Sequence, residues 1–398
     1  MNLVTDSQMA TQRKLKLGVL VSHPIQYFVP VYRELATAAG VDLTVLYRTR
    51  VGVDAYHDDG FGQTVQWDIP LLDGYNYHFL SSKNRIQGVE WSVIGAIFHS
   101  RFDVILVHGY NSVTNVLAIL AARLIGTKVL MRGDTRVQAN HKKKGLKARL
   151  KQVFFTCCNG FVTIGTLNRA YYAQHGVPPG RLFFAPFCVS NEQFQVAPEV
   201  KTRKRYEIRT ELGLANDSLI VLFASKLIKR KRTEDLIQAF AGLAEACPLA
   251  HLVIAGSGEE ENSLQHLAKS IGGQKIYFIG FQNQTQLPPL YAASDIFVLP
   301  ADSEPWGLVV NEVMAAGVPV IVSSEVGAAP DLVDGKGTGI VYLCGDVNAL
   351  SQAMLSLLTD PIRRQQMAQR AVTLIQDWDV PACARGILQA AHAVAPNK

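Results

Sequence analysis

The sequence lacks any apolar run that is both long enough and clean enough to span a bilayer as a helix. The longest candidate, residues 306–322, contains Asn311, Glu312 and Pro319. The N-terminal region also lacks a secretory signal, because its apolar stretch, Leu17 to Val21, is short and no small-residue cleavage site follows it. We therefore expect a globular protein that is not embedded in a membrane and that resides in the cytoplasm.

Cysteine is sparse and unpatterned. The six cysteines include no CxxC pair and form no dense framework of the kind that disulfide-stabilised domains have. We expect reduced core residues, and the adjacent Cys157 and Cys158 leave a redox pair as the alternative. No metal is expected either, because the DxD-like run Asp377-Trp378-Asp379 precedes a terminal helix instead of following a strand.

What the sequence does contain is an alternation of short apolar runs and longer helical patterns from end to end. With 398 residues, the chain exceeds what one hydrophobic core usually supports, so two domains are expected. The alternation is typical of βαβ units and a parallel sheet. The expected strands are Leu15–Val21, Leu43–Tyr47, Val104–Val107, Lys128–Met131, Phe161–Ile164 and Leu182–Phe184, then Leu219–Ala224, Leu252–Ala255, Ile276–Ile279, Ile296–Leu299 and Val318–Val322.

This pattern predicts an α/β fold of two Rossmann-like, doubly wound parallel-sheet domains that face a cleft. The first domain is expected over residues 1–190 and the second over residues 191–375, since the strand–helix alternation is lost around residues 187–200. The helices expected after the last β-unit are 347–358, 361–375 and 381–394. The last one, within residues 376–398, is expected to cross back to the first domain.

Charge is distributed unevenly along the chain. Residues 1–190 have 21 Lys and Arg against 11 Asp and Glu, which leaves 18 against 22 for residues 191–398 from totals of 39 and 33. The stretch 135–191 has no acidic residue. We therefore expect the first domain to bind an anionic partner. Nucleic acid is not expected, because no binding module or interleaved aromatic pattern accompanies the basic residues.

One basic segment, residues 142–154, has two interpretations. Its basic residues are Lys142, Lys143, Lys144, Lys147, Arg149 and Lys151, and its apolar stripe consists of Leu146, Leu150, Val153 and Phe154. In the first interpretation the stripe belongs to a core and the lysines are solvated. In the second, the helix lies on an anionic membrane surface, which would suit a lipid-linked acceptor and a peripheral position on the inner face of the membrane.

The most informative stretch covers residues 301–324. It follows a buried strand and opens a helix, with Ser303 as the expected N-cap and Pro305 in the first turn. Unpaired amides and the helix dipole favour an anion at such a helix start, and a diphosphate is the natural occupant. The amides expected to be free are those of Trp306, Gly307 and Leu308.

Two glutamates, Glu304 and Glu312, are eight positions apart in this stretch. Along a helix that spacing corresponds to about 12 Å, which is too far for paired acid–base work but suits the two ends of one elongated ligand. Glu304 is expected to accept hydrogen bonds from sugar hydroxyls, and Glu312 from a ribose diol. The order sugar, phosphate, ribose is that of a nucleotide sugar.

A basic turn supplies positive charge to the same region. It is Ser225-Lys226-Leu227-Ile228-Lys229-Arg230-Lys231, which follows an expected strand at the sheet edge where such folds bind ligands. Lys226 and Lys231 are expected to hold the diphosphate. When the glycosidic C–O bond breaks, negative charge grows on the leaving phosphate, and preplaced cations stabilise that state more than the ground state. No metal or other cofactor is required for this role.

At these residues the chain resembles the retaining glycosyltransferases of family four, the group 1 glycosyltransferases with the GT-B fold. Glu304 and Glu312 match the E-x7-E motif of that family, and Ser225-Lys226-Leu227 with Lys231 matches its basic signature. The turns at Gly256-Ser257-Gly258 and Phe278-Ile279-Gly280 are similar in shape and spacing. Gly256 is therefore a candidate ligand contact, although without a third glycine an ordinary tight turn is the favoured interpretation.

The resemblance implies a nucleotide-sugar donor in the C-terminal domain, an acceptor in the N-terminal domain and retention of anomeric configuration. The implied reaction moves a sugar from an NDP-sugar to a hydroxyl of a glycan or lipid-linked acceptor, as in polysaccharide or glycolipid biosynthesis. Two alternatives are a non-catalytic nucleotide-sugar-binding subunit and a sugar-nucleotide epimerase of the same architecture.

Two departures from the family pattern concern the catalytic groups. Lys226 replaces the usual arginine, which binds phosphate with a different geometry. Where many members have a functional histidine, this chain has Arg132-Gly133-Asp134. Arg132 is therefore a candidate for binding phosphate or acceptor, and Asp134 for assisting deprotonation. His23 and His108, each just after an expected strand, are the other candidates.

Overall fold

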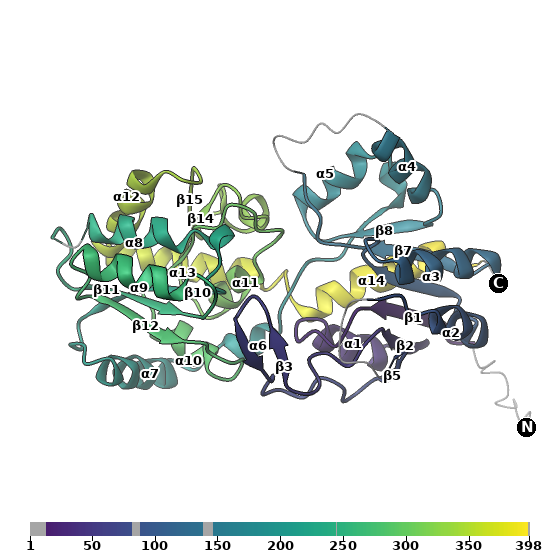
Figure 1. The fold of residues 1–398 in the computed structure, drawn as a ribbon, viewed down its shortest axis with the longest axis horizontal. Helices are drawn as coiled ribbons and strands as arrows, with labels where there is room; N and C mark the ends of the chain where they lie inside the picture. Colours follow the sequence, from purple (N-terminus) through teal and green to yellow (C-terminus); the bar gives the residue numbers. More distant parts are fainter. Residues whose placement is uncertain (1–12, 82–87, 138–145, 244, 397–398) are drawn as a thin grey trace, which may run out of the picture.

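The computed structural model describes residues 13–396 except 82–87, 138–145 and 244. Two parallel sheets, each flanked by helices, form two domains that lie side by side (Figure 1). The strand order is β5-β2-β1-β6-β7-β8-β9 in the first sheet and β12-β11-β10-β13-β14-β15 in the second. Both orders reverse direction at an inner strand, as in doubly wound folds, so the predicted α/β architecture is confirmed.

The first sheet has inner strands that are almost entirely buried on both faces. Its strands are β1 (Leu15–Val21), β2 (Val41–Tyr47), β5 (Asn76–Phe79), β6 (Val104–His108), β7 (Lys128–Arg132), β8 (Gly160–Thr163) and β9 (Leu182–Phe184). The helices around it are α1 (Val29–Thr37), α2 (Ser92–Ser100), α3 (Val113–Leu124), α4 (Leu146–Phe155) and α5 (Thr166–Gln174). In β6 the first four residues are all buried, which is typical of a parallel strand covered on both sides.

The second sheet positions two loops next to each other. Its strands are β10 (Leu219–Ala224), β11 (Ala250–Ala255), β12 (Ile276–Gly280), β13 (Ile296–Leu299), β14 (Val320–Ser323) and β15 (Gly339–Tyr342). The helices with it are α6 (Asn191–Phe194), α7 (Pro198–Glu211), α8 (Thr233–Ala241), α9 (Glu261–Ser270), α10 (Leu287–Ala293), α11 (Leu308–Ala315), α12 (Val347–Leu358) and α13 (Pro361–Ile375). Because β10 pairs in parallel with β13, the segments that follow these two strands meet at one edge of the sheet.

The last helix, α14 (Val380–Val394), returns to the first domain, as the sequence predicts (Figure 1). The Asp379 carboxylate caps it by accepting from the amide of Ala382 at 2.7 Å. Its buried face, which includes Cys383 and Ile387, joins the core formed by α1 and the first sheet. Close packing requires Gly386, because a Cβ there would lie 2.3 Å from the carbonyl oxygen of Phe184.

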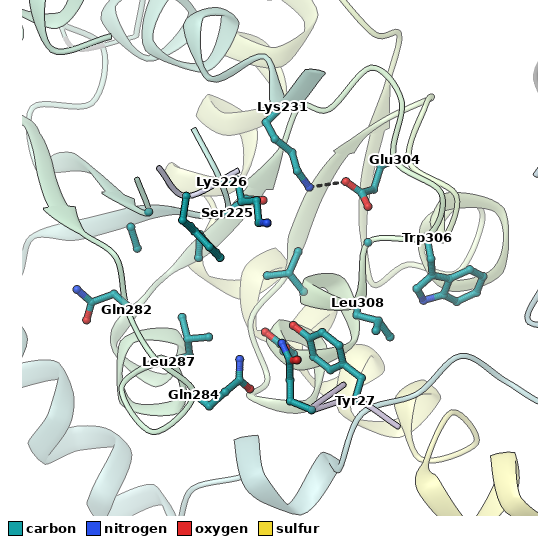
Figure 2. Close-up of a pocket in the computed structure, with 18 of the residues that line it drawn as sticks. Tyr27, Ser225, Lys226, Lys231, Gln282, Gln284, Leu287, Glu304, Trp306 and Leu308 are labelled. Atoms are coloured by element: carbon teal, nitrogen blue, oxygen red, sulfur yellow. Dashed lines mark hydrogen bonds and ion pairs between the residues drawn. The ribbon is translucent and has the colours of Figure 1, made fainter. Parts of the chain in front are cut away.

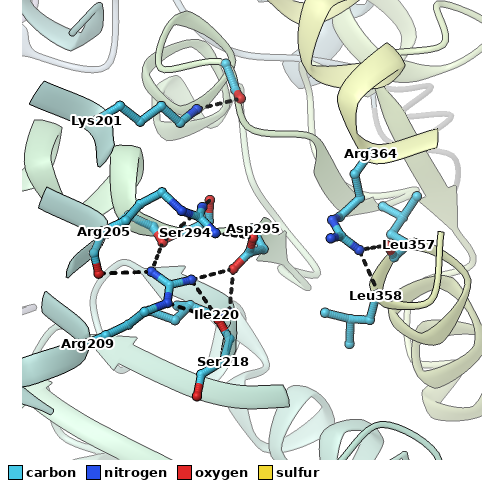
Figure 3. A network of polar contacts seen from close by, with 12 residues as sticks. Lys201, Arg205, Arg209, Ser218, Ile220, Ser294, Asp295, Leu357, Leu358 and Arg364 are labelled. Carbon is cyan, nitrogen blue, oxygen red and sulfur yellow. Dashed lines mark hydrogen bonds and ion pairs between the residues drawn. The ribbon is translucent and has the colours of Figure 1, made fainter. Parts of the chain in front are cut away.

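A buried charge cluster fixes α7 to the second sheet (Figure 3). Asp295 accepts from Arg209 at 2.9 Å, from Arg205 at 2.8 Å and from the amide of Ile220 at 2.8 Å. Arg209 is only 1% exposed and also donates to the carbonyl of Ser218. A buried guanidinium is stable only when it is paired and hydrogen-bonded, so this carboxylate anchors the helix that begins the second domain.

A short antiparallel hairpin, β3 (Tyr56–Asp58) with β4 (Gln63–Val65), is absent from the sequence prediction. Its turn is held by the Asp58 side chain, whose Oδ1 accepts from the amides of Gly60 at 2.9 Å and Phe61 at 3.1 Å. The hairpin belongs to the first domain by sequence but lies at the domain junction (Figure 1). It therefore brings first-domain residues into contact with the second domain.

The basic segment 142–154 is described only from residue 146, where α4 begins, so Lys142, Lys143 and Lys144 lie outside the described residues. Val153 is 65% exposed, whereas Phe154 packs against the core. The interpretation of the stripe as part of a core is therefore wrong at Val153, and the membrane-surface interpretation stays a prediction. The Lys151 ammonium donates to the Tyr171 hydroxyl at 2.8 Å.

All six cysteines are free. Within the ranges that the structure describes, no helix has the length and apolar character needed to cross a membrane.

Candidate active site

A cavity of about 420 Å³ lies at the junction of the two domains (Figure 2). Its second-domain wall consists of the loops that follow β10, β11, β12 and β13, which is the sheet edge where open parallel sheets bind ligands. The first domain contributes Tyr27, Asp58 and Asp134, among others. The volume falls in the range of about 300–1,000 Å³ found for small-molecule pockets.

The basic turn after β10 faces this cavity with Lys231, which is buried and ion-paired with Glu304 (Figure 2). Arg230, which the sequence analysis does not single out, lies 3.3 Å from the same carboxylate. Burial lowers the pKa of Lys231, and the charge of Glu304 opposes that change. Two cations and one carboxylate thus lie at one corner of the cavity, so the net charge of that corner is positive and favours an anionic ligand.

Lys226 lines the same cavity, but its partner comes from the other domain. Its ammonium lies 2.6 Å from Oδ1 of Asp58, and it also sits 4.6 Å from the centre of the Phe61 ring. Burial alone would raise the pKa of Asp58, but the hydrogen bond and charge of Lys226 outweigh it, and the net pKa is lowered. Asp58 is a residue that sequence reasoning missed, because the contact spans 168 positions.

The segment before α11 differs from the prediction. The helix begins at Leu308 with Gly307 as its N-cap, so Ser303 is not the cap and Pro305 is not in the first turn. Gly307 has φ +92°, a left-handed conformation that favours glycine. Glu304 lies before the helix and forms a bridge to Val326 of the loop after β14. This tertiary pairing holds Glu304 against the loop after β14, outside the helix.

Residues 306–308 all line the cavity, yet their roles differ. The Trp306 side chain is buried; its indole nitrogen donates to Asn311 at 2.9 Å, and its ring stacks on Trp378 with centroids 5.2 Å apart. Trp306 is therefore a packing residue. Gly307 and Leu308 provide the start of α11, where backbone amides without helical partners face an anion most favourably.

Glu312 lies inside α11 and is 1% exposed. One oxygen accepts from the Tyr291 hydroxyl at 2.6 Å, while Oε1 has no hydrogen-bond partner within 3.5 Å in the described part of the chain. Burial raises the pKa of Glu312 to about 7, and the hydroxyls of Tyr291 and Tyr27 oppose the rise. A buried acceptor without a partner in a ligand-sized cavity is available to a ligand hydroxyl. The 12 Å helical separation from Glu304 does not apply, because Glu304 precedes the helix.

Of the first-domain candidates, only Asp134 lines the cavity. His108 packs against the Phe28 ring with centroids 4.6 Å apart, and burial lowers its pKa to about 3. Arg132 is 3% exposed and donates to the carbonyl of Pro186 at 3.3 Å. Neither side chain lines the cavity, so the structure does not bring these two candidates into the site.

His23 also lies outside the cavity lining, contrary to the prediction. Its Nδ1 is 2.8 Å from the Ser22 hydroxyl, and burial lowers its pKa to about 4. The neighbouring residues Gln26 and Tyr27 reach the cavity instead. The first βα turn thus contributes to the cavity through the residues that follow the histidine.

Gly256 lines the cavity at the turn after β11. It has φ +145°, and a Cβ there would lie 1.9 Å from the carbonyl oxygen of Ser225. Glycine thus lets this turn pass directly beside the basic turn. The loop after β12 adds further lining residues that the prediction omitted, namely Phe281, Gln282 and Gln284.

Comparison with known proteins places the second domain in a family. Residues 204–373 match the family model described as Glycosyl transferases group 1. The predicted resemblance to that family is therefore confirmed over the domain that carries the basic turn and both glutamates.

Among the described residues, no three His, Cys, Asp or Glu side chains are grouped as a metal ion would require.

Two curated relatives are mannosyltransferases. The chain is 37% identical over 166 residues to the GDP-mannose-dependent monoacylated alpha-(1-6)-phosphatidylinositol monomannoside mannosyltransferase of Corynebacterium glutamicum, covering 40% of this chain and 43% of that protein. It is 32% identical over 212 residues to the GDP-mannose-dependent alpha-(1-6)-phosphatidylinositol monomannoside mannosyltransferase of Mycolicibacterium smegmatis, covering 51% and 54%. The chain thus spans about half the length of the curated relatives it matches.

The fold as a whole is similar to solved structures. The crystal structure of HepE from Anabaena in complex with UDP and glucose superposes with a TM-score of 0.72 at 15% identity, covering 94% of this chain and 98% of that one. At this identity the likeness shows the fold alone, which is the predicted GT-B arrangement of two Rossmann-like domains.

Proposed function

We propose that this protein is a retaining, nucleotide-sugar-dependent glycosyltransferase that moves a sugar from an NDP-sugar to a hydroxyl of a glycan or lipid-linked acceptor. The observation that carries the proposal is the grouping of Lys231, Arg230 and the start of α11 at one corner of the interdomain cavity. The names of the two mannosyltransferases support a glycolipid acceptor. Those names specify GDP-mannose, whereas HepE was crystallised with UDP, so the nucleotide base is a matter for experiment.

The chemistry follows from the charges. The bond between the anomeric carbon and the diphosphate oxygen breaks, and a bond to the acceptor oxygen forms. Lys231, Arg230 and the amides at residues 307–308 stabilise the charge that develops on the departing diphosphate. Glu304 keeps the two cations in place and accepts hydrogen bonds from the sugar. With this much positive charge supplied by side chains, we propose that the reaction needs no metal ion.

The acceptor side is assigned to the first domain. Asp134 is a carboxylate of that domain in the cavity, so we assign it the proton that leaves the acceptor hydroxyl. Peripheral contact with an anionic membrane through residues 142–154 would present a lipid-linked acceptor to this side. The exposed Val153 and Arg149 on the described part of α4 are compatible with that surface.

The test is donor-dependent release of nucleoside diphosphate, measured with GDP- and UDP-sugars and a panel of glycan and lipid-linked acceptors. Lys231→Ala and Glu304→Gln should each lower turnover by about 100-fold or more, the range seen when one charge-stabilising group is removed. The matched control is Lys229→Ala, which removes an exposed lysine from the same turn outside the cavity. Thermal unfolding checks that all three variants are folded.

Three other outcomes would overturn the assignment. Full activity in Lys231→Ala and Glu304→Gln would remove the site. Tight donor binding with no transfer to any acceptor would identify a non-catalytic subunit. Interconversion of the donor sugar without an acceptor would identify an epimerase.

A further inference from the structure

The β3–β4 hairpin is anchored to the second domain at several points. Asp58 pairs with Lys226 at 2.6 Å, and the Ser257 hydroxyl donates to the carbonyl of Phe61 at 2.9 Å. Just beyond the hairpin, the Asn283 side chain donates to the carbonyl of Gln66 at 2.7 Å. These second-domain partners lie on the loops after β10, β11 and β12, which form the cavity wall.

The tip of the hairpin fits closely over the basic turn. A Cβ at Gly60 would lie 2.7 Å from the outer part of the Lys226 side chain, which shows how closely the two approach. Phe61 packs edge-on against Phe281 with centroids 4.8 Å apart, and both rings line the cavity. The hairpin therefore covers the cavity between the basic turn and the loop after β12.

The ion pair creates a conflict of charge. Lys226 is one of the cations assigned to the donor diphosphate, and here its ammonium is bound to a carboxylate from the other domain. A diphosphate at the same place would bring a second anion against Asp58, and like charges a few ångströms apart repel strongly in a partly buried site. Lys226 therefore cannot serve both anions equally.

We propose that Asp58 competes with the donor diphosphate for Lys226, and that the β3–β4 hairpin is a lid which the donor must shift to bind. This inference rests on the proposed donor site and adds a first-domain residue that sets its affinity. The predicted consequence is unusual for a cavity residue, since removing the Asp58 charge strengthens nucleotide binding.

The test is isothermal titration of GDP and UDP into Asp58→Asn and the unaltered protein. Asparagine keeps the Oδ1 acceptor that holds the amides of Gly60 and Phe61, so the turn is retained. The matched control is Asp59→Asn, which removes the same charge at the next position. The Asp59 side chain is fully exposed and lies 3.7 Å from the His57 ring. The dissociation constant should fall about three- to tenfold in Asp58→Asn and stay within about twofold in Asp59→Asn.

A second pair of variants separates competition for Lys226 from general charge repulsion. In a Lys226→Ala background, adding Asp58→Asn should tighten nucleotide binding less than it does in the unaltered protein, because only the direct repulsion between Asp58 and the diphosphate is then relieved. Equal tightening in both backgrounds would overturn the inference, as would Asp58→Asn binding no more tightly than Asp59→Asn.

The outcomes also distinguish this inference from the proposed function. If nucleotide binds and Lys231→Ala weakens it, but Asp58→Asn has no effect, only the lid is wrong. If neither GDP nor UDP binds any of the variants or the unaltered protein, both proposals fail.

Discussion

Replacing Glu312 by glutamine should make the fold more stable at neutral pH. The carboxyl group is buried within α11, faces the hydroxyls of Tyr291 and Tyr27, and has no cation among its described hydrogen-bond partners. Removing it from water disfavours its charged form, and this raises its pKa from 4.5 to about 7. Above that pH the folded protein must hold an unpaired buried charge.

The magnitude follows from the two pKa values. Between pH 4.5 and about 7, folded Glu312 retains a proton that the unfolded chain has lost, so stability falls as pH rises through this window. At about 1.4 kcal/mol per pH unit, the loss at pH 8 is about 3 kcal/mol. Glutamine carries no charge at any pH. The Glu312→Gln variant should therefore exceed the unaltered protein by up to about 3 kcal/mol at pH 8, and the difference should vanish near pH 4.5.

Urea unfolding of both proteins from pH 4.5 to pH 8 measures this difference directly. Exposed Glu211, at the end of α7, provides the matched control, and Glu211→Gln should show no such pH-dependent gain. The same Glu312→Gln variant should bind donor more weakly, because a charged acceptor for the ribose hydroxyls is lost. A pH-independent difference, or a less stable variant at pH 8, would refute the assignment of a buried, uncompensated carboxylate.

Two further substitutions test the structure around the site. Gly256→Ala should destabilise the protein by about 2 to 6 kcal/mol in thermal unfolding, since the new Cβ would meet the Ser225 carbonyl at 1.9 Å in a left-handed conformation. The control is Gly272→Ala, which is also at positive φ but has no atom within 4 Å of the new Cβ. It should cost only about 1 to 2 kcal/mol. Asp295→Asn should cost about 3 to 5 kcal/mol in urea unfolding, because it leaves buried Arg209 without its anion, whereas Asp217→Asn at an exposed position should be near neutral. Equal effects within either pair would contradict the stated cause.

The strands that the sequence predicts well are those buried on both faces. Apolar runs such as Leu15–Val21 and Leu219–Ala224 have the predicted bounds in the structure. The edge strands β5 and β15 were missed, because Asn76–Phe79 is mostly exposed and Gly339–Tyr342 begins with glycine. The edge strands β9 and β12, which are apolar runs, were predicted, so composition decides more than position at the edge.

The start of α11 shows where local rules give way to tertiary contacts. Ser303 followed by Pro305 fits the ordinary pattern of a helix N-terminus, yet Glu304 bridges to Val326 and the helix begins only at Leu308. Gly307 then adopts a positive φ directly before α11 begins. The pairing partner lies on the loop after β14, and no signal near Ser303 could indicate it.

Two of the residues missed at the site, Tyr27 and Asp58, reach the cavity from the first domain. Tyr27 faces Glu312, and Asp58 pairs with Lys226, so each end of the proposed donor site is already contacted by a first-domain side chain. Hydrophobic periodicity and motif spacing describe each domain separately, so they cannot predict contacts between side chains of different domains.

The two contacts have a common consequence for ligand binding. Under the proposed competition, Lys226 is available to a ligand only to the extent that Asp58 moves away, and Tyr27 borders the open oxygen of Glu312. We therefore expect the relative position of the domains to influence the affinity of the second-domain site. The returning chain is tied to the same place, because Trp378, just before α14, stacks on Trp306, next to the start of α11. A shift of α14 with the first domain would therefore move the start of α11 as well as the contacts of Lys226 and Glu312. If Asp58 competes with the donor as proposed, donor binding and movement of the first domain form one coupled equilibrium.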